Sequence, residues 1–153
     1  MKIITKNGNL LTNVYSGHVV HGCNARGVMG SGFALAIKNM YPTVYEDYRD
    51  IHDKDGLILG NAYPVMPTEK LIIWNAITQE NCGSDGKRYV SYDAIETCFK
   101  QINESIPHIL ESEVSQEIHI PLLGAGLGGG NWEIIREIIE QTVVFPTTLW
   151  LLK

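Results

Sequence analysis

Two glycine-rich segments are the part of this sequence best suited to chemistry. They occupy residues 21–33 (HGCNARGVMGSGF) and 121–133 (PLLGAGLGGGNWE), and each stands between an apolar run and a helical pattern. Backbone without Cβ atoms can approach an anion closely and direct several N–H groups at it. One such loop is as consistent with a tight turn as with a ligand. Two loops at equivalent positions favour a diphosphate-binding site.

Few side chains in these segments can carry chemistry. His21 can act as an acid or a base on a phosphate ester if its pKa is near the ordinary value. A half-buried strand histidine bonded to a backbone carbonyl is the alternative, and it stays open. We expect Cys23 to pack rather than to act as a nucleophile, and His18 to lie far from the ligand end of its strand. From residue type alone, Asn24 indicates a turn or a cap at the strand end.

Known nucleotide-binding motifs fit this chain poorly. G-x-x-x-x-G-K-[ST] is absent, which argues against a P-loop nucleotide hydrolase. Gly124, Gly126 and Gly129 do match G-x-G-x-x-G. The dinucleotide fold, however, places this loop first and an acidic residue about twenty positions later. Here the sequence continues to LWLLK without such an acid, so a Rossmann dehydrogenase is disfavoured.

Alternating apolar runs and helical patterns predict an α/β fold that positions both segments. The runs predicted as strands cover residues 2–5, 18–23, 61–66, 70–76, 117–123 and 147–152. The predicted helices cover Phe33 to Met40, Pro42 to Ile51, the stretch from a Ser91 cap to Ile106, and Ile134 to Ile139. The irregular stretch 78–89 is a candidate surface or lid loop.

Composition limits the class of protein. With 153 residues, of which 44% are hydrophobic, we expect a single domain over residues 1–153. A net charge of −5 argues against general nucleic-acid binding, which needs a cationic surface. No signal-peptide pattern or membrane-length apolar segment is present, so we expect a cytoplasmic protein without membrane contacts. Three widely spaced cysteines predict reduced thiols and no metal site.

Five stretches together resemble the macro domain, in particular the compact single-domain macro proteins of bacteria and phages. They are residues 8–12 (GNLLT), 21–42 (HGCNARGVMGSGFALAIKNMYP), 56–65 (GLILGNAYPV), 75–95 (NAITQENCGSDGKRYVSYDAI) and 120–133 (IPLLGAGLGGGNWE). The resemblance implies a three-layer α/β/α sandwich with a mixed, mostly parallel central sheet. It also implies ADP-ribose as the ligand, with no further cofactor. The relatives include ADP-ribose-1''-phosphate phosphatases and hydrolases of ADP-ribosyl-glutamate or ADP-ribosyl-nucleotides.

The resemblance implies a set of ligand-binding residues. Asn9 stands where the family usually has an aspartate that accepts from the adenine amino group, and an asparagine carbonyl can accept the same bond. Without the family, Asn9 indicates only a turn. Asn24 matches the asparagine that holds the distal ribose. The other implied positions lie in the two loops and at strand ends: Leu10, Val28, Met29, Gly30, Ser31, Gly32, Thr78, Leu123, Gly124, Ala125, Gly126, Leu127, Gly128, Gly129 and Gly130.

Two positions carry the catalytic part of the resemblance. His21 matches the histidine of the phosphatases. Lys38 matches a lysine that attacks the distal ribose in the hydrolases, although it lies about two helical turns, or about 10 Å, from the loop. Without the family, Lys38 indicates a solvated lysine that stabilises the end of its helix.

The acidic partners of the relatives are missing here. One aspartate position holds Asn131, which also suits the N-cap of the last helix, and another holds Gly128. Asparagine cannot act as a general base, so water activation would pass to His21, to the ligand's phosphate, or to Asp85 or Asp93 from the long loop.

Three hypotheses follow from the resemblance. The first is hydrolysis of ADP-ribose-1''-phosphate, with His21 as acid or base, Asn131 near the reaction and Asn24 positioning the ribose. The second is Lys38-dependent removal of ADP-ribose from protein glutamate or from DNA. The third is a reader or sequestering protein for ADP-ribose-type ligands that catalyses nothing.

Overall fold

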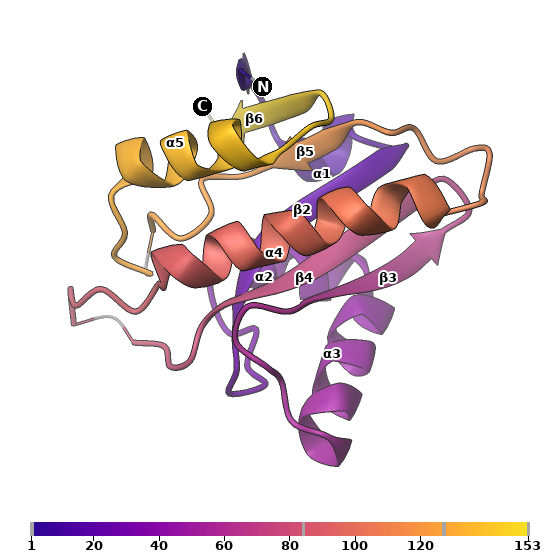
Figure 1. The fold of residues 1–153 in the computed structure, drawn as a ribbon. Helices are drawn as coiled ribbons and strands as arrows, with labels where there is room; N and C mark the ends of the chain where they lie inside the picture. The colour runs from indigo at the N-terminus through magenta and orange to yellow at the C-terminus, as the bar shows by residue number, and fades with distance from the viewer. Residues whose placement is uncertain (1, 84, 127, 153) are drawn as a thin grey trace.

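A six-stranded sheet with the order β1-β6-β5-β2-β4-β3 forms the centre of the protein (Figure 1). The computed structural model describes residues 2–83, 85–126 and 128–152. The strands are β1 (Ile4–Asn7), β2 (Gly17–Asn24), β3 (Ala62–Thr68), β4 (Leu71–Gln79), β5 (Ile118–Ile120) and β6 (Thr147–Leu151). Neighbours from β1 across to β4 pair in parallel, and β3 pairs with β4 in antiparallel. The sheet is therefore mixed and mostly parallel, as predicted.

Helices cover both faces of this sheet. They are α1 (Leu10–Asn13), α2 (Gly32–Met40), α3 (Pro42–Lys54), α4 (Tyr92–Ser105) and α5 (Trp132–Thr142), with a 3-10 turn η1 (Ile106–His108) after α4. In Figure 1, α4 and α5 lie in front of the sheet, and α1, α2 and α3 lie behind it. This arrangement confirms the predicted three-layer α/β/α sandwich.

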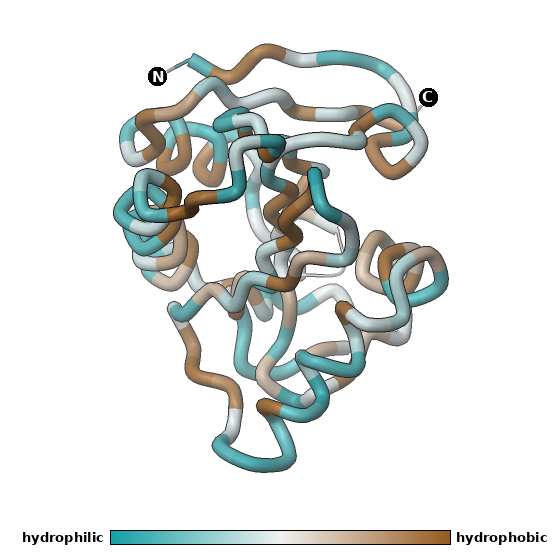
Figure 2. The backbone as a smooth tube through the Cα atoms, turned by 90° about the vertical axis from the view of Figure 1, so that its right-hand side faces the viewer, coloured by the Kyte–Doolittle hydropathy of each residue, from teal (hydrophilic) through white to brown (hydrophobic). Residues whose placement is uncertain are grey.

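The central strands are apolar on both faces, as parallel strands between two helical layers must be. In β2 and β4, Val20 and Trp74 belong to the core under α4 and α5, whereas Val19 and Ile73 belong to the core under α1 and α2. Figure 2 shows the resulting pattern, with brown apolar stretches in the central strands and alternating brown and teal along the helices. Successive residues of β2 therefore face opposite layers, which decides where each site residue points.

Local signals explain where the long helices begin. The Ser91 hydroxyl accepts from Ala94 N at 3.1 Å, which confirms the predicted cap of α4. Pro42 occupies the first turn of α3, where its missing N–H leaves no helical bond unmade. The apolar stripe of α4 that contains Ile95 and Phe99 is fully buried.

The structure differs from the sequence-based prediction at several elements. β4 ends at Gln79 rather than at Ala76, and α3 and α5 are longer than predicted. The short helix α1 was not predicted, because its four residues are too few for a helical period to show. β1 runs over residues 4–7 rather than 2–5, since Ile3 is buried against α5 and pairing with β6 begins only at Ile4. β5 is limited to three residues of the predicted run 117–123. Within the described residues, no helix is long and apolar enough to cross a membrane.

Candidate ligand-binding site

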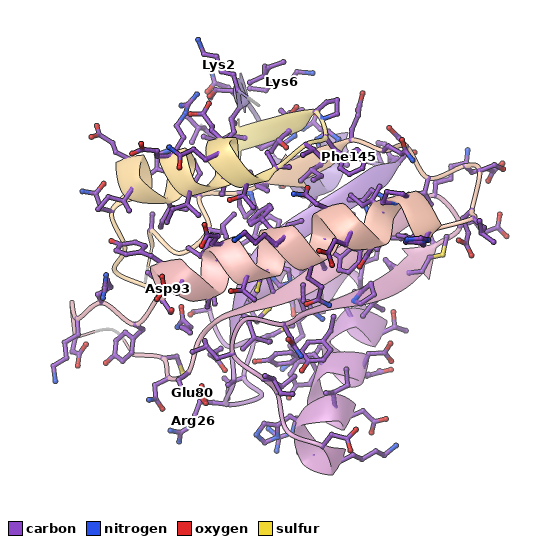
Figure 3. All side chains as sticks on the ribbon, in the orientation of Figure 1. Lys2, Lys6, Arg26, Glu80, Asp93 and Phe145 are labelled. Atoms are coloured by element: carbon purple, nitrogen blue, oxygen red, sulfur yellow. The ribbon has the colours of Figure 1, made fainter. Side chains whose placement is uncertain are left out.

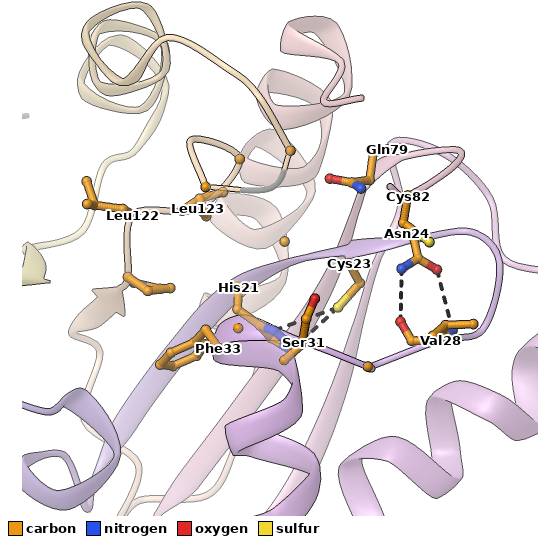
Figure 4. A pocket seen from close by; sticks show the side chains of 18 of the residues that line it. His21, Cys23, Asn24, Val28, Ser31, Phe33, Gln79, Cys82, Leu122 and Leu123 are labelled. Atoms are coloured by element: carbon orange, nitrogen blue, oxygen red, sulfur yellow. Dashed lines mark hydrogen bonds between the residues drawn. The ribbon is translucent and has the colours of Figure 1, made fainter. Parts of the chain in front are cut away.

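The carboxyl ends of β2, β4 and β5 meet at a cavity of about 500 Å³ (Figure 4). This is the edge where ligands collect in open α/β sheets. The residues that line it are His21, Gly22, Cys23, Asn24, Val28, Gly30, Ser31, Gly32, Phe33, Ala34, Gln79, Cys82, Gly83, Pro121, Leu122, Leu123, Gly124, Gly126 and Gly128. Both glycine-rich segments predicted from the sequence therefore lie at one cavity.

Asn24 at the end of β2 shapes the first loop. Its side-chain Nδ2 donates to Val28 O at 2.9 Å (Figure 4), and its Oδ1 accepts from Arg26 N at 3.0 Å. The Tyr48 hydroxyl also donates to the Asn24 backbone carbonyl, at 2.6 Å. Asn24 thus has the structural role of a turn residue and lines the cavity as well. Its contact with a distal ribose stays a prediction.

The first loop offers unbonded amides to the cavity. Among the described residues, no acceptor is found for the backbone N–H groups of Gly30, Ser31 or Gly32, all of which line the cavity. Ser31 is the N-cap residue of α2, yet its side chain makes no capping bond. The positive end of the α2 dipole adds to these donors. An anion can therefore bind here through backbone groups.

The second loop divides its amides between two tasks. Gly129 N donates to Gly126 O at 3.0 Å, and Gly130 N donates to Gly124 O at 2.8 Å, so both amides are used inside the loop. Gly124, Gly126 and Gly128 line the cavity, and their N–H groups find no acceptor within the described ranges. Only part of the glycine run can therefore bind a ligand through its amides.

The rest of the glycine run is required by close packing. The Gly128 carbonyl accepts from Tyr89 N at 2.7 Å and from Val90 N at 3.0 Å. A Cβ atom on Gly129 would lie 2.9 Å from Arg88 Cα, and Gly129 also has a φ of +71°, which favours glycine. A Cβ atom on Gly130 would lie 2.6 Å from Val90 Cγ1. Close packing is therefore a second reason for glycine at these positions, and the diphosphate role of the run stays a prediction.

His21 lines the cavity as a neutral imidazole. Asn75 Nδ2 donates to Val44 O at 3.4 Å, which turns the Asn75 Oδ1 toward His21 Nε2 at 2.6 Å. Nε2 therefore carries the proton and Nδ1 remains an acceptor. Burial lowers the pKa of His21 to about 4, against the weaker opposing effect of the Asn75 hydrogen bond. The ring is 1% exposed and packs near Phe33. The condition given above for its acid or base chemistry, a pKa near the ordinary value, therefore does not hold, and the alternative of a buried strand histidine is the one observed.

Lys38 does not line the cavity. It lies in the last turn of α2, and its ammonium group sits 4.2 Å from the centre of the Tyr45 ring on α3. This cation–π contact holds the side chain away from the N-terminal end of α2, where the loop is. A catalytic role for Lys38 would require the side chain to leave Tyr45.

No aspartate or glutamate lines the cavity within the described residues. Asp85 is exposed and accepts from the Tyr89 hydroxyl at 2.8 Å, a bond that lowers the pKa of this carboxyl group. Asp93 lies in the first turn of α4, and Figure 3 shows it apart from Arg26 and Glu80. Neither Asp85 nor Asp93 lines the cavity, so of the three alternatives for water activation this one finds no support in the geometry.

Asn131 is the N-cap residue of α5. Its Oδ1 accepts from Glu133 N at 2.9 Å, and its own backbone N–H donates to the Tyr92 hydroxyl at 3.0 Å. The structure shows the helix-capping role that the sequence analysis considered for Asn131, and Asn131 does not line the cavity.

A metal site was not predicted from the sequence. Within residues 2–83, 85–126 and 128–152, no group of three histidine, cysteine or acidic side chains lies close enough together to hold a metal ion.

Several predicted ligand residues lie outside the cavity wall. Asn9 caps α1, with its Oδ1 accepting from Leu11 N at 3.0 Å, and its contact with adenine stays a prediction. His18 lies at the opposite end of β2, as expected, and accepts from Trp74 Nε1 at 2.9 Å. Leu127 lies outside the described residues. Six further residues predicted to bind the ligand are described by the structure but do not line the cavity: Leu10, Met29, Thr78, Ala125, Gly129 and Gly130.

The cavity also contains residues that were not predicted from the sequence. Gln79, Cys82 and Gly83 enter from the end of β4 and the loop that follows it. Arg26 Nη1 donates to Asn81 Oδ1 at 2.9 Å, which joins this loop to the first glycine loop. The only feature of the sequence that could have indicated these residues was the irregular stretch 78–89, which was predicted as a surface or lid loop. The further unpredicted residues are Gly22, Cys23, Phe33, Ala34, Pro121 and Leu122.

The fold and the site together define an α/β/α domain that presents two amide-lined loops at the carboxyl ends of its central strands. Residues 20–139 match the family model described as Macro domain. The chain therefore belongs to the macro domain family, as the sequence resemblance indicated.

Similar proteins come from a phage and from bacteria. A protein of Enterobacteria phage T4, described as an uncharacterized 17.5 kDa protein, is 32% identical over 80% of this chain and 77% of its own length. A protein of unknown function from Bacteroides thetaiotaomicron has a TM-score of 0.85 at 29% identity, covering 99% of each chain. Thermosipho africanus DarTG, solved in complex with ADP-ribose, has a TM-score of 0.76 at 21% identity, covering 97% of this chain and 41% of that one.

Proposed function

We propose that the cavity binds ADP-ribose, with the diphosphate held by backbone amides of both glycine-rich loops. The observation that carries this proposal is the two sets of unbonded amides that line one cavity, those of Gly30, Ser31 and Gly32 and those of Gly124, Gly126 and Gly128. No charged side chain lines this cavity among the residues that the structure describes. Backbone donors and the α2 dipole suit a diphosphate that no lysine or arginine of the described cavity wall neutralises. The fold shared with a protein solved in complex with ADP-ribose supports the choice of ligand.

We further propose that the protein hydrolyses ADP-ribose-1''-phosphate. Water would add to phosphorus and the bond between phosphorus and the C1'' oxygen would break, giving ADP-ribose and inorganic phosphate. His21 is the titratable imidazole in the cavity wall, and its neutral form can accept a proton from water. A phosphate next to the ring would raise the pKa of His21, because a negative charge favours the imidazolium form.

Phosphate release from ADP-ribose-1''-phosphate tests this proposal directly. The wild type should release phosphate and His21→Ala should lose at least about 100-fold in rate, the usual contribution of a proton-transfer group. His18→Ala is the matched control, because His18 is equally buried on the same strand but lies at the other end. Equal rates for the wild type and His21→Ala would remove His21 from the reaction.

Binding without turnover is the second candidate function. It is favoured by the lack of any aspartate or glutamate in the described cavity wall, since the reaction needs a base and His21 is a weak one. Calorimetry with ADP-ribose, run beside the phosphate assay, separates the two candidates. Tight ADP-ribose binding with no phosphate release would establish a reader and exclude the phosphatase.

A further inference from the structure

The structure has a second cavity, of about 240 Å³, at the end of β2 opposite to the candidate site. In the part of the chain that the structure describes, its wall consists of His18 at the start of β2, Ile106 of η1 and residues of the segment that follows η1: Ile109, Leu110, Glu111, Ser112, Val114 and Gln116. This segment is the loop at the right of Figure 1 that joins α4 to β5. None of these residues lines the first cavity, and we call the second one the amino-end pocket.

The side chain of His18 is a buried hydrogen-bond donor in the wall of this pocket. Only 1% of the residue is exposed, and Trp74 Nε1 donates to His18 Nδ1 at 2.9 Å. An indole N–H can only donate, so Nδ1 carries no proton, and the neutral ring carries its proton on Nε2. Burial lowers the pKa of His18 to about 4, so the ring is neutral at pH 7.

The Nε2–H of His18 has no acceptor among the described residues. In the same part of the chain, the only side-chain nitrogen or oxygen atom that is both unpaired and fully shielded from solvent is Thr78 Oγ1. His18 Nε2 must therefore be open to the pocket that His18 lines. Since buried polar groups in native proteins are nearly always paired, the acceptor should belong to whatever fills the pocket.

The other wall residues limit what can fill it. Four of them are apolar: Ile106, Ile109, Leu110 and Val114. Leu110 is 89% exposed, so a ligand in the pocket would cover apolar surface that now faces water. Glu111 is the only charged residue of the described wall, and its carboxylate disfavours an anion.

We propose that the amino-end pocket binds a small, uncharged aliphatic ligand whose carbonyl oxygen accepts a hydrogen bond from His18 Nε2. A carbonyl oxygen is a neutral acceptor, and the aliphatic part would pack against Leu110 and its apolar neighbours. The volume of the pocket equals that of about eight water molecules, which suits a ligand of a few carbon atoms rather than a nucleotide. Because the first cavity shares no residue with this pocket, binding here can be tested without ADP-ribose.

Isobutyramide is a suitable probe, because it combines a carbonyl oxygen with a branched aliphatic group. In an NMR titration it should shift the His18 Nε2–H resonance until the shift saturates, with a Kd on the order of 1 mM, as expected for so small a ligand. The His21 ring should not respond, since it lies toward the other end of β2 and lines the other cavity.

Isobutyrate tests the charge of the ligand, because it has the same shape and a negative charge. It should bind more weakly than isobutyramide, and Glu111→Gln should reduce the difference between the two probes. Glu113→Gln is the matched control. Glu113 is an exposed residue of the same segment that does not line the pocket, so this variant should leave the difference nearly unchanged.

Two substitutions test the wall of the pocket. His18→Phe should weaken isobutyramide binding about tenfold, the loss expected for one hydrogen bond, as followed on the backbone amide resonance of Leu110. Leu110→Ala should also weaken binding, because apolar contact area is lost. Leu152→Ala is the control for it, since Leu152 is 80% exposed and lies outside the wall.

Three results would count against this site. If no saturable His18 shift is observed, only water occupies the pocket and the site is overturned. Equal binding of isobutyrate and isobutyramide overturns the uncharged class of ligand. If His18→Phe does not fold, the leucine variants decide: weaker binding in Leu110→Ala alone supports the site, and equal affinity in Leu110→Ala and Leu152→Ala overturns it.

Discussion

Lowering the pH from 7 toward 4 should destabilise the protein through His21. Burial lowers the pKa of this histidine to about 4, from the ordinary value of 6.5. Between these two values the unfolded chain binds one proton more than the folded protein, so the free energy of unfolding rises with pH. One proton corresponds to about 1.4 kcal/mol per pH unit. The contribution of His21 to the free energy of unfolding is fully present above pH 6.5, and about 3 kcal/mol of this contribution is lost when the pH falls to 4.

Urea unfolding at a series of pH values measures this effect. His21→Gln should lack the His21 part of the pH slope and should therefore lose less stability between pH 6.5 and 4.5 than the wild type. His18 also has a pKa lowered to about 4 by burial, so His18→Gln should reduce the slope by a similar amount. Because the two rings lie at opposite ends of β2, the double variant should combine both reductions.

Histidine NMR resonances provide the control for this reasoning. The His21 ring should keep the resonances of a neutral imidazole, with the proton on Nε2, down to about pH 5. A ring titration with its midpoint near 6.5, or the same pH slope in the wild type and His21→Gln, would refute the argument. Only about one molecule in a thousand carries the protonated ring at pH 7. Protonation of the free His21 ring should therefore add no step to the pH profile of kcat/KM between pH 5.5 and 8, where only the phosphate group of the substrate, with a pKa of about 6, should change it.

The remaining predictions concern the second loop and two residues outside the cavity. Gly129→Ala should lower the free energy of unfolding by at least about 2 kcal/mol in urea titrations, because Gly129 has a positive φ and contacts the backbone of Lys87. Gly126→Ala is the control. Its added Cβ would meet nothing within 4 Å, so this variant should unfold nearly as the wild type does. Lys38→Ala should keep ADP-ribose affinity and phosphate release, and a large loss of either would show that the side chain leaves Tyr45 to act in the cavity. Asn131→Ala should lower stability by about 1 kcal/mol in the same urea titrations, while Asn131→Asp should retain the cap.

The order of the elements was predictable because hydrophobic periodicity is a local property. Ile95 and Phe99 repeat at helical spacing behind the Ser91 cap, and the structure has α4 there. The ends of β1 were not predictable in the same way. Its pairing with β6 joins residues more than 140 positions apart, such as Ile4 and Thr148, and no local pattern records that register.

The composition of the cavity was predictable only where the glycine-rich segments form it. Gln79 and Cys82 belong to the cavity because Tyr89 and Val90 attach the segment after β4 to the Gly128 carbonyl. This attachment spans almost forty residues and uses backbone groups, so side-chain types do not signal it. The shifted pKa of His21 was equally hidden, since burial of its ring depends on tertiary packing.

The glycine run 124–130 has two physical reasons rather than one. Gly129 is small because the backbone of Lys87 and Arg88 packs directly against it, and Gly130 is small because the Val90 side chain and the Gly124 carbonyl do. Gly126 has open space around it, so packing does not exclude a side chain there, and its unbonded amide lines the cavity. The packed glycines fix the position of Gly128 through its two carbonyl hydrogen bonds. The segment 87–90 therefore holds the amides of the second loop in place before any ligand arrives, which reduces the entropy that binding must remove.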